Sequence, residues 1–165
     1  MPDVRNRTWT SVAVVAAIIA IASTSDQLPD RVASHFGADG LANGFMTRHM
    51  YLALMLGIGV GLPALIGLTV GPSVRRFSRF INIPNREYWL APARREATVA
   101  YVAAHTARLV VGLAAFAVAV HLLVIRANRL HPPRLETDVM IALLALLAAV
   151  LAAWIAVLSR RFRLD

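Results

Sequence analysis

The sequence contains no cysteine and no lysine, and only 16% of its residues are charged. The absence of cysteine excludes disulfides, thiolate zinc sites and cysteine nucleophiles. A metal ion would have to be held by histidine and carboxylate side chains. Soluble domains carry about 25% charged residues, so this chain has too few charges for an ordinary water-soluble protein.

Apolar residues are correspondingly abundant in the sequence. Hydrophobic residues make up 58% of the 165 residues, and they are concentrated in blocks, as a bilayer requires. The sequence therefore predicts an all-α integral membrane protein, a bundle of four transmembrane helices in a single membrane domain. The predicted spans cover residues 9–25, 51–71, 105–125 and 138–158.

The first two spans have features of their own. The first reads either as a short transmembrane helix or as a signal peptide, because Ala20-Ile21-Ala22 resembles a cleavage pattern. We expect it to be retained. In the second span, Pro63 frees one backbone carbonyl and predicts a kink. The pairs Gly57/Gly61 and Gly67/Gly71 have the spacing that lets helices approach closely, inside the bundle or at a homodimer seam.

Three segments connect the spans: residues 26–49, 72–104 and 126–136. Glycine, proline and Asn-Gly signals predict a structured, turn-rich loop for the first of them. Pro92 suits the first turn of a helix. We expect that helix to run to Ile125, with residues 93–104 as an interfacial or cytoplasmic lead-in to the third span.

The arginines predict the orientation of the bundle. Eleven of the 17 lie before the first span, in the 72–104 loop or after the last span, and five lie in the other two loops. Because basic residues accumulate on the cytoplasmic side, both termini and the 72–104 loop are expected to be cytoplasmic. The 26–49 and 126–136 loops are then outer loops. The arginines do not form a stripe with interleaved aromatics, so we expect no nucleic-acid partner.

Two motifs resemble a known family. The outer loop contains Leu28-Pro29-Asp30-Arg31-Val32-Ala33-Ser34-His35-Phe36-Gly37-Ala38-Asp39-Gly40 and then Asn43-Gly44-Phe45. This run resembles the signature of a bacterial membrane family, domain of unknown function 1648. The cytoplasmic run Ile81-Asn82-Ile83-Pro84-Asn85-Arg86-Glu87-Tyr88-Trp89-Leu90-Ala91-Pro92 is similar to a segment of that family's short members. The same domain forms the N-terminal part of SdpI-type toxin-immunity proteins. The resemblance thus implies a bacterial membrane protein with an immunity-like or receptor-like role.

Histidines and carboxylates in the outer loop offer a candidate metal or proton site. His35, Asp39 and His49 are residue types that bind a divalent ion, and imidazoles also titrate near neutral pH. No HxxxH, HExxH or EF-hand spacing occurs. We therefore expect no cofactor, with a divalent metal held by these three residues as the alternative. The simpler hypothesis is that the histidines form hydrogen bonds within the loop.

Two further features lie near the cytoplasmic side. The segment from Asn82 to Pro92 combines aromatic residues with nearby arginines, and it is expected either to lie at the headgroups of the lipid bilayer or to dock a partner. Arg108 lies within the third span, three residues after His105. A charge inside a span is costly and often functional. Arg108 is expected either to snorkel to the interface or to contact Glu87 or Glu96.

The function expected from these observations is that of a non-catalytic binding or accessory protein, multi-pass in the inner (plasma) membrane of a bacterium. Its outer 28–45 loop is the expected recognition element, and its partner is another membrane protein or a second copy. The alternative is an oligomeric small transport or channel component, and the third hypothesis is a metal-dependent membrane hydrolase. The candidate ligand- or partner-binding residues are Pro29, Asp30, His35, Asp39, Gly40, Asn82, Pro84, Asn85, Tyr88, Trp89 and Arg108.

Overall fold

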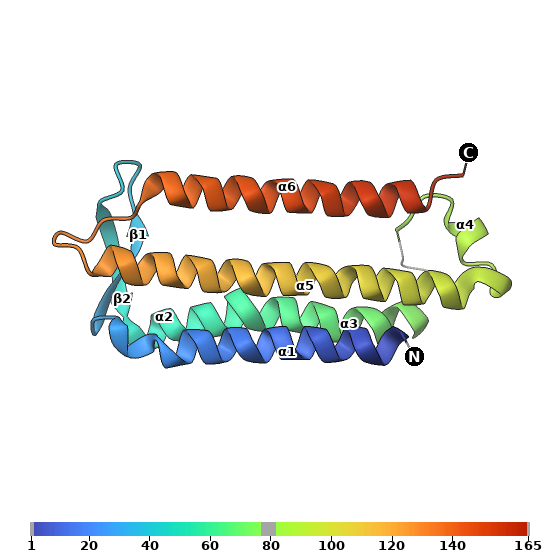
Figure 1. Cartoon of the computed structure of the whole chain (residues 1–165), viewed down its shortest axis with the longest axis horizontal. Coiled ribbons are helices and arrows are strands. Elements are labelled where there is room, and N and C mark those ends of the chain that lie inside the picture. Colours follow the sequence, from blue (N-terminus) through green and yellow to red (C-terminus); the bar gives the residue numbers. More distant parts are fainter. Residues whose placement is uncertain (1, 77–81, 165) are drawn as a thin grey trace.

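The computed structural model describes residues 2–76 and 82–164. Long helices lie side by side, a β-hairpin covers one end, and both termini lie at the other end (Figure 1). The long helices are α1 (Pro2–Ser23), α5 (Pro92–Asn128), α6 (Thr137–Arg161) and a composite helix of α2 (Arg48–Leu54), η2 (Met55–Gly61) and α3 (Leu62–Arg76). The short elements are η1 (Ser25–Gln27), β1 (Arg31–Phe36), β2 (Ala42–Thr47) and α4 (Arg86–Trp89).

Four helices are long and apolar enough to cross a membrane, over Thr8–Gln27, Arg48–Thr69, Pro92–Asn128 and Thr137–Arg161. The predicted number of helices is therefore confirmed, and so is Pro92 as the first residue of α5. The fold is mainly helical, as predicted, and β1 and β2 add a two-stranded antiparallel sheet in the 26–49 loop that was not predicted. Helix α5 includes the predicted lead-in of residues 93–104, and α3 continues five residues beyond the predicted second span, to Arg76. Residues 77–81, including Ile81 of the second motif, lie outside the described residues.

At Pro63 the composite helix changes its winding, whereas the sequence predicted a kink. The seven residues of η2 form a wide π-helical stretch that ends immediately before Leu62, whose N–H bonds to the carbonyl of Gly57 five residues back. A proline inside an α-helix clashes with the carbonyl four residues before it. A wider turn at that point relieves the clash, which explains why the helix changes its winding just ahead of Pro63.

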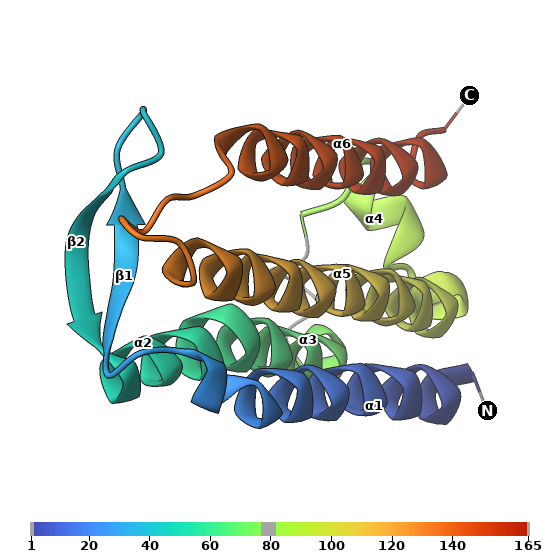
Figure 2. The ribbon, with the colours of Figure 1, turned by 60° about the vertical axis from the view of Figure 1, so that its left-hand side comes forward.

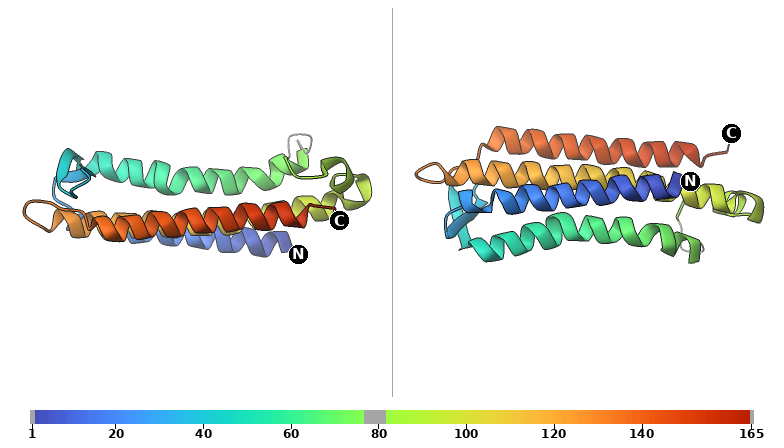
Figure 3. Two further views of the ribbon diagram at one scale, coloured as in Figure 1. Left: turned by 90° about the horizontal axis from the view of Figure 1, so that it is seen from above. Right: turned by 60° about the horizontal axis from the view of Figure 1, so that its bottom comes forward.

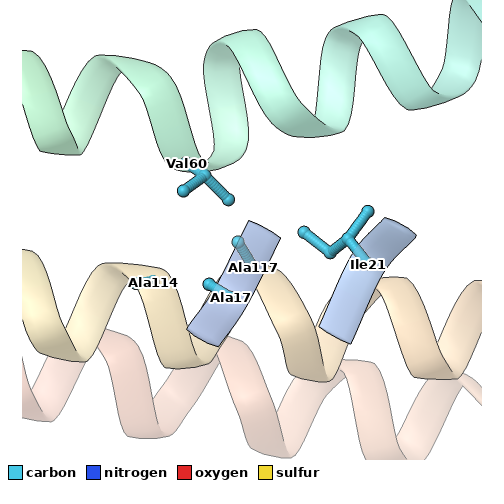
Figure 4. Packing of buried hydrophobic residues seen from close by; sticks show 5 residues of the cluster. All are labelled: Ala17, Ile21, Val60, Ala114 and Ala117. Atoms are coloured by element: carbon cyan, nitrogen blue, oxygen red, sulfur yellow. The ribbon is translucent and has the colours of Figure 1, made fainter. Parts of the chain in front are cut away.

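Small residues let three helices meet at the centre. Ala17 and Ile21 of α1, Val60 of η2, and Ala114 and Ala117 of α5 form a buried cluster, drawn in Figure 4. The glycines of the second span divide into two groups. A Cβ atom on Gly67 would lie 3.0 Å from Val110 Cγ2, so Gly67 packs inside the bundle, whereas one on Gly57 would meet nothing within 4 Å. The small-residue spacing is thus used internally at Gly67 and faces open space at Gly57.

The last helix is attached to one side of the bundle. No residue of α6 is buried, and the views in Figure 3 place it along α5. His105 and Trp154 join the two helices, since each ring nitrogen lies 2.9 Å from the other residue's carbonyl oxygen. The two rings also stack, with centroids 4.8 Å apart. A reciprocal pair therefore holds a helix that otherwise has little buried surface.

Candidate functional site

The outer-loop motif folds into the hairpin of β1 and β2 (Figure 2). The strands pair antiparallel with Ala33 opposite Phe45, and the register shifts on either side of His35. Gly44 lies at the first shift, where a Cβ atom would be 2.8 Å from the Cβ of His35. Only glycine fits at this close approach of the strands. The Asn-Gly pair therefore lies within β2 and not in a loop.

A buried apolar cluster anchors the hairpin to the helices. Its members lie in the segment before β1, in β1 itself, in α2 and near the end of α5: Leu28, Val32, Tyr51, Val124 and Ile125. Leu28 is 1% exposed and Val32 is fully buried. Burying a side chain of this size contributes about 1.5–3 kcal/mol. The hairpin is therefore a packed part of the fold.

Asn128, the last residue of α5, fixes the outer edge of β1. Its Oδ1 accepts a hydrogen bond from the Ala33 N–H at 2.8 Å, and its Nδ2 donates to the Ala33 carbonyl at 3.0 Å and to the Val124 carbonyl at 2.9 Å. Asn128 is 8% exposed. The side-chain amide thus pairs with both backbone groups of Ala33, as a neighbouring strand would.

The segment after α5 closes over the tip of the hairpin. The Ala42 N–H donates to the Pro133 carbonyl at 3.1 Å, and the Leu135 N–H donates to the Gly40 carbonyl at 2.8 Å. Gly40 has φ +79°, and a Cβ atom there would lie 2.7 Å from the Leu135 oxygen. Gly40, predicted to contact a ligand, is required by the backbone conformation and by this contact.

The predicted residues at the base of the hairpin have structural partners. Arg48 Nη2 lies 2.8 Å from Asp30 Oδ1, and Arg48 Nε lies 3.5 Å from the Pro29 carbonyl. The Arg48 backbone N–H also donates to the Asp30 carbonyl at 2.9 Å. Pro29 and Asp30 therefore orient the start of α2 against the start of β1, and both are exposed.

The three candidate metal ligands are not brought together. His35 Nδ1 is hydrogen-bonded to Asn43 Oδ1, and Asp39 Oδ1 accepts from the Leu41 N–H at 3.1 Å. His49 is exposed on α2. Over residues 2–76 and 82–164, no three histidine, cysteine, aspartate or glutamate side chains are grouped to hold a metal ion. The contacts of His35 and Asp39 are hydrogen bonds within the hairpin.

At the opposite end, the second motif contacts the end of α6. Asn85 Nδ2 donates to the Phe162 carbonyl at 3.0 Å, and Trp89 Nε1 donates to the same oxygen at 2.9 Å. Asn85 has φ 52°, a left-handed conformation that asparagine tolerates. The Arg94 guanidinium lies 4.0 Å from the ring centroid of Tyr88. The asparagine and tryptophan of the motif therefore bind the C-terminal end of α6.

The remaining predicted residues are separated from one another. Asn82 and Pro84 are exposed. Arg108 is also exposed, and it forms no ion pair within the part of the chain that the structure describes. His105 is 4% exposed and is directed toward Trp154 of α6. The expected ion pair between Arg108 and Glu87 or Glu96 is not observed among the described residues. Arg108 is exposed and His105 is buried, so these two residues do not share an environment.

A buried polar network near the hairpin was not predicted. His121 is completely buried, with Tyr51 Oη 3.1 Å from Nδ1 and Thr24 Oγ1 3.0 Å from Nε2. The Thr24 hydroxyl also lies 2.6 Å from the Ala20 carbonyl. Because that hydroxyl has one proton and donates it to Ala20, Nε2–H of neutral His121 donates to Thr24, and Nδ1 accepts from Tyr51. One imidazole thus joins three of the long helical segments.

A sequence signal for this network existed. His121 is a polar residue inside an otherwise apolar block, and polar residues at such positions face the bundle interior and find partners. The identity of those partners was not readable, because Tyr51 lies 70 residues away and Thr24 lies 97 residues away.

The fold and the hairpin define the class of protein, which is a small helical bundle with four candidate membrane spans and a β-hairpin fixed over one end. The model of the family described as "Domain of unknown function (DUF1648)" matches residues 12–60. This match confirms the family resemblance of the outer-loop motif, which lies within the matched residues. The second motif lies outside the matched residues. No curated protein and no solved structure matches the chain.

Proposed function

We propose that this protein spans the inner (plasma) membrane of a bacterium four times, with both termini and α4 in the cytoplasm. Four long apolar helices support the membrane location, and the asymmetry of the arginines supports the orientation. In this orientation the hairpin and the segment between α5 and α6 lie outside the cytoplasm.

The orientation is testable because the chain contains no cysteine. Single cysteines at His131 and Glu87, both exposed and at opposite ends of α5, are expected to differ in reactivity. In intact cells, an impermeant maleimide should label His131→Cys and leave Glu87→Cys unlabelled until the membrane is permeabilised. Labelling of both variants in intact cells would contradict four spans with cytoplasmic termini.

We further propose that the protein is a non-catalytic binding or accessory protein whose hairpin recognises an extracytoplasmic partner. The observation that carries this proposal is a pair of exposed apolar side chains on a fixed hairpin. Phe45 is 44% exposed and Leu41 is 40% exposed, while β1 is held by Asn128 and by the buried cluster. Apolar and aromatic side chains held on a rigid element are suited to anchor a partner. The resemblance of the outer-loop motif to a domain of SdpI-type immunity proteins also favours a receptor-like role for this hairpin.

The alternative is an oligomeric transport or channel component. It is favoured by the open space at Gly57 in the second span, where an added Cβ atom would meet no described atom within 4 Å. Close approach of another helix at such a position is the usual basis of association in lipid. Native mass spectrometry distinguishes the two functions, because the transport hypothesis requires a stable homo-oligomer.

The binding function predicts that a partner depends on the hairpin. Mild extraction of the protein with a C-terminal tag, followed by quantitative mass spectrometry, should recover a stoichiometric membrane or extracytoplasmic protein. Phe45→Ala should reduce that recovery at least tenfold, because interface aromatics commonly contribute about 2 kcal/mol. The side chain of Phe45 is exposed, so its removal should leave the fold intact.

Leu164→Ala provides the matched control. Leu164 is 47% exposed, close to the 44% of Phe45, and it lies beside the C-terminus, at the end of the bundle opposite the hairpin. Recovery of the partner should be unchanged in this variant. A partner-free preparation, or equal recovery with Phe45→Ala and wild type, would refute recognition by the hairpin.

A further inference from the structure

The outer edge of β2 carries backbone groups that no described residue uses. In an antiparallel ladder, directly opposed residues alternate between pairs that bond to each other and pairs whose N–H and C=O groups point outward. Both backbone groups of Ala33 bond to Asn128, so Ala33 is of the outward kind. Phe45 lies opposite Ala33 and Thr47 lies opposite Arg31. The backbone groups of Phe45 and Thr47 therefore also point outward, away from β1.

The neighbouring residues agree with this alternation. The Arg48 N–H donates inward to the Asp30 carbonyl, which places Thr47 in the outward register. At the other end of the strand, the Ala42 N–H already bonds to Pro133. The segment after α5 thus pairs with the beginning of this edge and leaves it before Phe45. Within the described part of the chain, Phe45 and Thr47 have no backbone partner on this side.

This edge lacks the features that protect exposed strands. Native proteins cover edge strands or place charges and prolines on them. The six residues Ala42–Thr47 contain neither a charged residue nor a proline. Bulges also protect edges, and the register shifts here lie between Ala33 and Phe36, before the part of β2 that faces outward. An unprotected edge is suited to accept another strand.

The position of the edge indicates what occupies it. Asn128 lies on the outer edge of β1, so the outer edge of β2 faces away from the end of α5. Figure 2 shows β2 on the outside of the hairpin, with β1 between it and the helices. In a membrane the edge then faces the aqueous side. Two copies in the same membrane would both direct it away from the bilayer, so their edges would not meet. A peptide approaching from the aqueous side can pair with it.

We propose that an extended peptide segment of an extracytoplasmic partner adds to the outer edge of β2 as a third strand. Its backbone bonds to Phe45 and Thr47, and its side chains alternate between the Phe45 face and solvent. The Arg31 guanidinium lies 5.2 Å from the Phe45 ring centroid, and it has no carboxylate partner among the described residues. The segment therefore carries an acidic side chain beside an apolar one. This inference rests on the proposed binding function and names its partner chemistry.

Thr47 offers a matched pair of variants. Its φ is −67°, the value to which proline is restricted, so Thr47→Pro removes the outward N–H without changing the backbone. Both Thr47→Pro and Thr47→Ala lose the hydroxyl that accepts from the Met50 N–H at the start of α2. Only the proline variant loses the edge donor, so the pair isolates strand addition from capping.

The probe is a displayed library of random seven-residue peptides, panned against the full-length protein in lipid nanodiscs. Selected peptides are expected to be rich in aspartate or glutamate. They should bind Thr47→Ala within about threefold of wild type and Thr47→Pro at least tenfold more weakly. Binding should also slow amide exchange at Phe45 and Thr47, which should exchange faster than Met46 in the free protein.

Two results would overturn strand addition. One is equal binding of the selected peptides to Thr47→Pro and Thr47→Ala, and the other is enrichment of no peptide from the library. Neither result decides the proposed binding function, which fails only if partner recovery is absent or is insensitive to Phe45→Ala. The two failures are therefore separable.

Discussion

Asn128→Asp is expected to release the hairpin from the end of α5 while the helices remain packed. The substitution preserves shape and keeps the acceptor for the Ala33 N–H. It removes the donor to the Ala33 and Val124 carbonyls and places a carboxylate at 8% exposure beside these two oxygens. The Val124 carbonyl keeps its backbone donor within α5, but the buried Ala33 carbonyl is left without a donor, which costs about 1–3 kcal/mol, and the carboxylate repels both oxygens. We expect a loss of about 3 kcal/mol.

Amide hydrogen exchange in nanodiscs measures this effect. A loss of about 3 kcal/mol corresponds to roughly a hundredfold faster opening, so amides of β1 and β2 should exchange about two orders of magnitude faster. Exchange in the middle of α5 should be unchanged, because local opening does not require the bundle to separate. Hairpin exchange within threefold of wild type would show that Asn128 does not fix the strand.

Asn43→Asp is the control for this change. Asn43 is exposed, and its Oδ1 is the atom that contacts His35, so the carboxylate can replace it. The same chemical change should therefore leave exchange in the hairpin within about threefold of wild type. If both substitutions accelerate exchange equally, the cause is the added charge and not the loss of the amide donor.

The long helices were predictable because lipid imposes a simple rule. A spanning helix must be apolar for about 20 residues, and the four blocks satisfy this rule without reference to any contact. The helix ends were less predictable. The helix α3 continues five residues past the predicted end of the second span, since backbone hydrogen bonds continue through polar sequence once the helix has formed. The composite winding at η2 required knowledge of how Pro63 is accommodated.

The hairpin was not predicted from the sequence because its strands are irregular. The run from Arg31 to Phe36 alternates imperfectly, because the register shifts at His35, and the partner strand contains Gly44. A period of two is the main signal for strands, and the bulge interrupts it. Part of what holds the hairpin is Asn128, which lies 95 residues after Ala33. No local pattern encodes such a contact.

Several candidate binding residues of the two motifs have structural contacts that the sequence could not supply. Asn85 and Trp89 share the carbonyl of Phe162, 77 and 73 residues further along the chain. Asp30 is paired with Arg48. Phe45 and Leu41 are the exposed large apolar residues of the hairpin.

His121→Ala is expected to have the other large effect, on the bundle itself. The side chain is fully buried between Tyr51 of α2 and Thr24 after α1. Hydrogen bonds between membrane helices contribute about 0.6 kcal/mol on average and at most about 1.7. Truncating a large buried side chain adds a cavity cost of about 2 kcal/mol or more. The expected total is about 3 kcal/mol, most of it from the lost packing.

Thermal unfolding in mild detergent measures this loss. A change of about 3 kcal/mol in a chain of this size lowers Tm by roughly 6–12 °C. Tyr51→Phe removes one hydrogen bond and no packing, so it should lower Tm by less than half as much. His131→Ala is the control, because His131 is exposed, and its Tm should match wild type. If Tyr51→Phe is as damaging as His121→Ala, the hydrogen bonds and not the packing of the imidazole hold the three segments together. If neither variant changes Tm, the buried histidine contributes nothing to the stability of the bundle, and its conversion to an apolar residue should be tolerated.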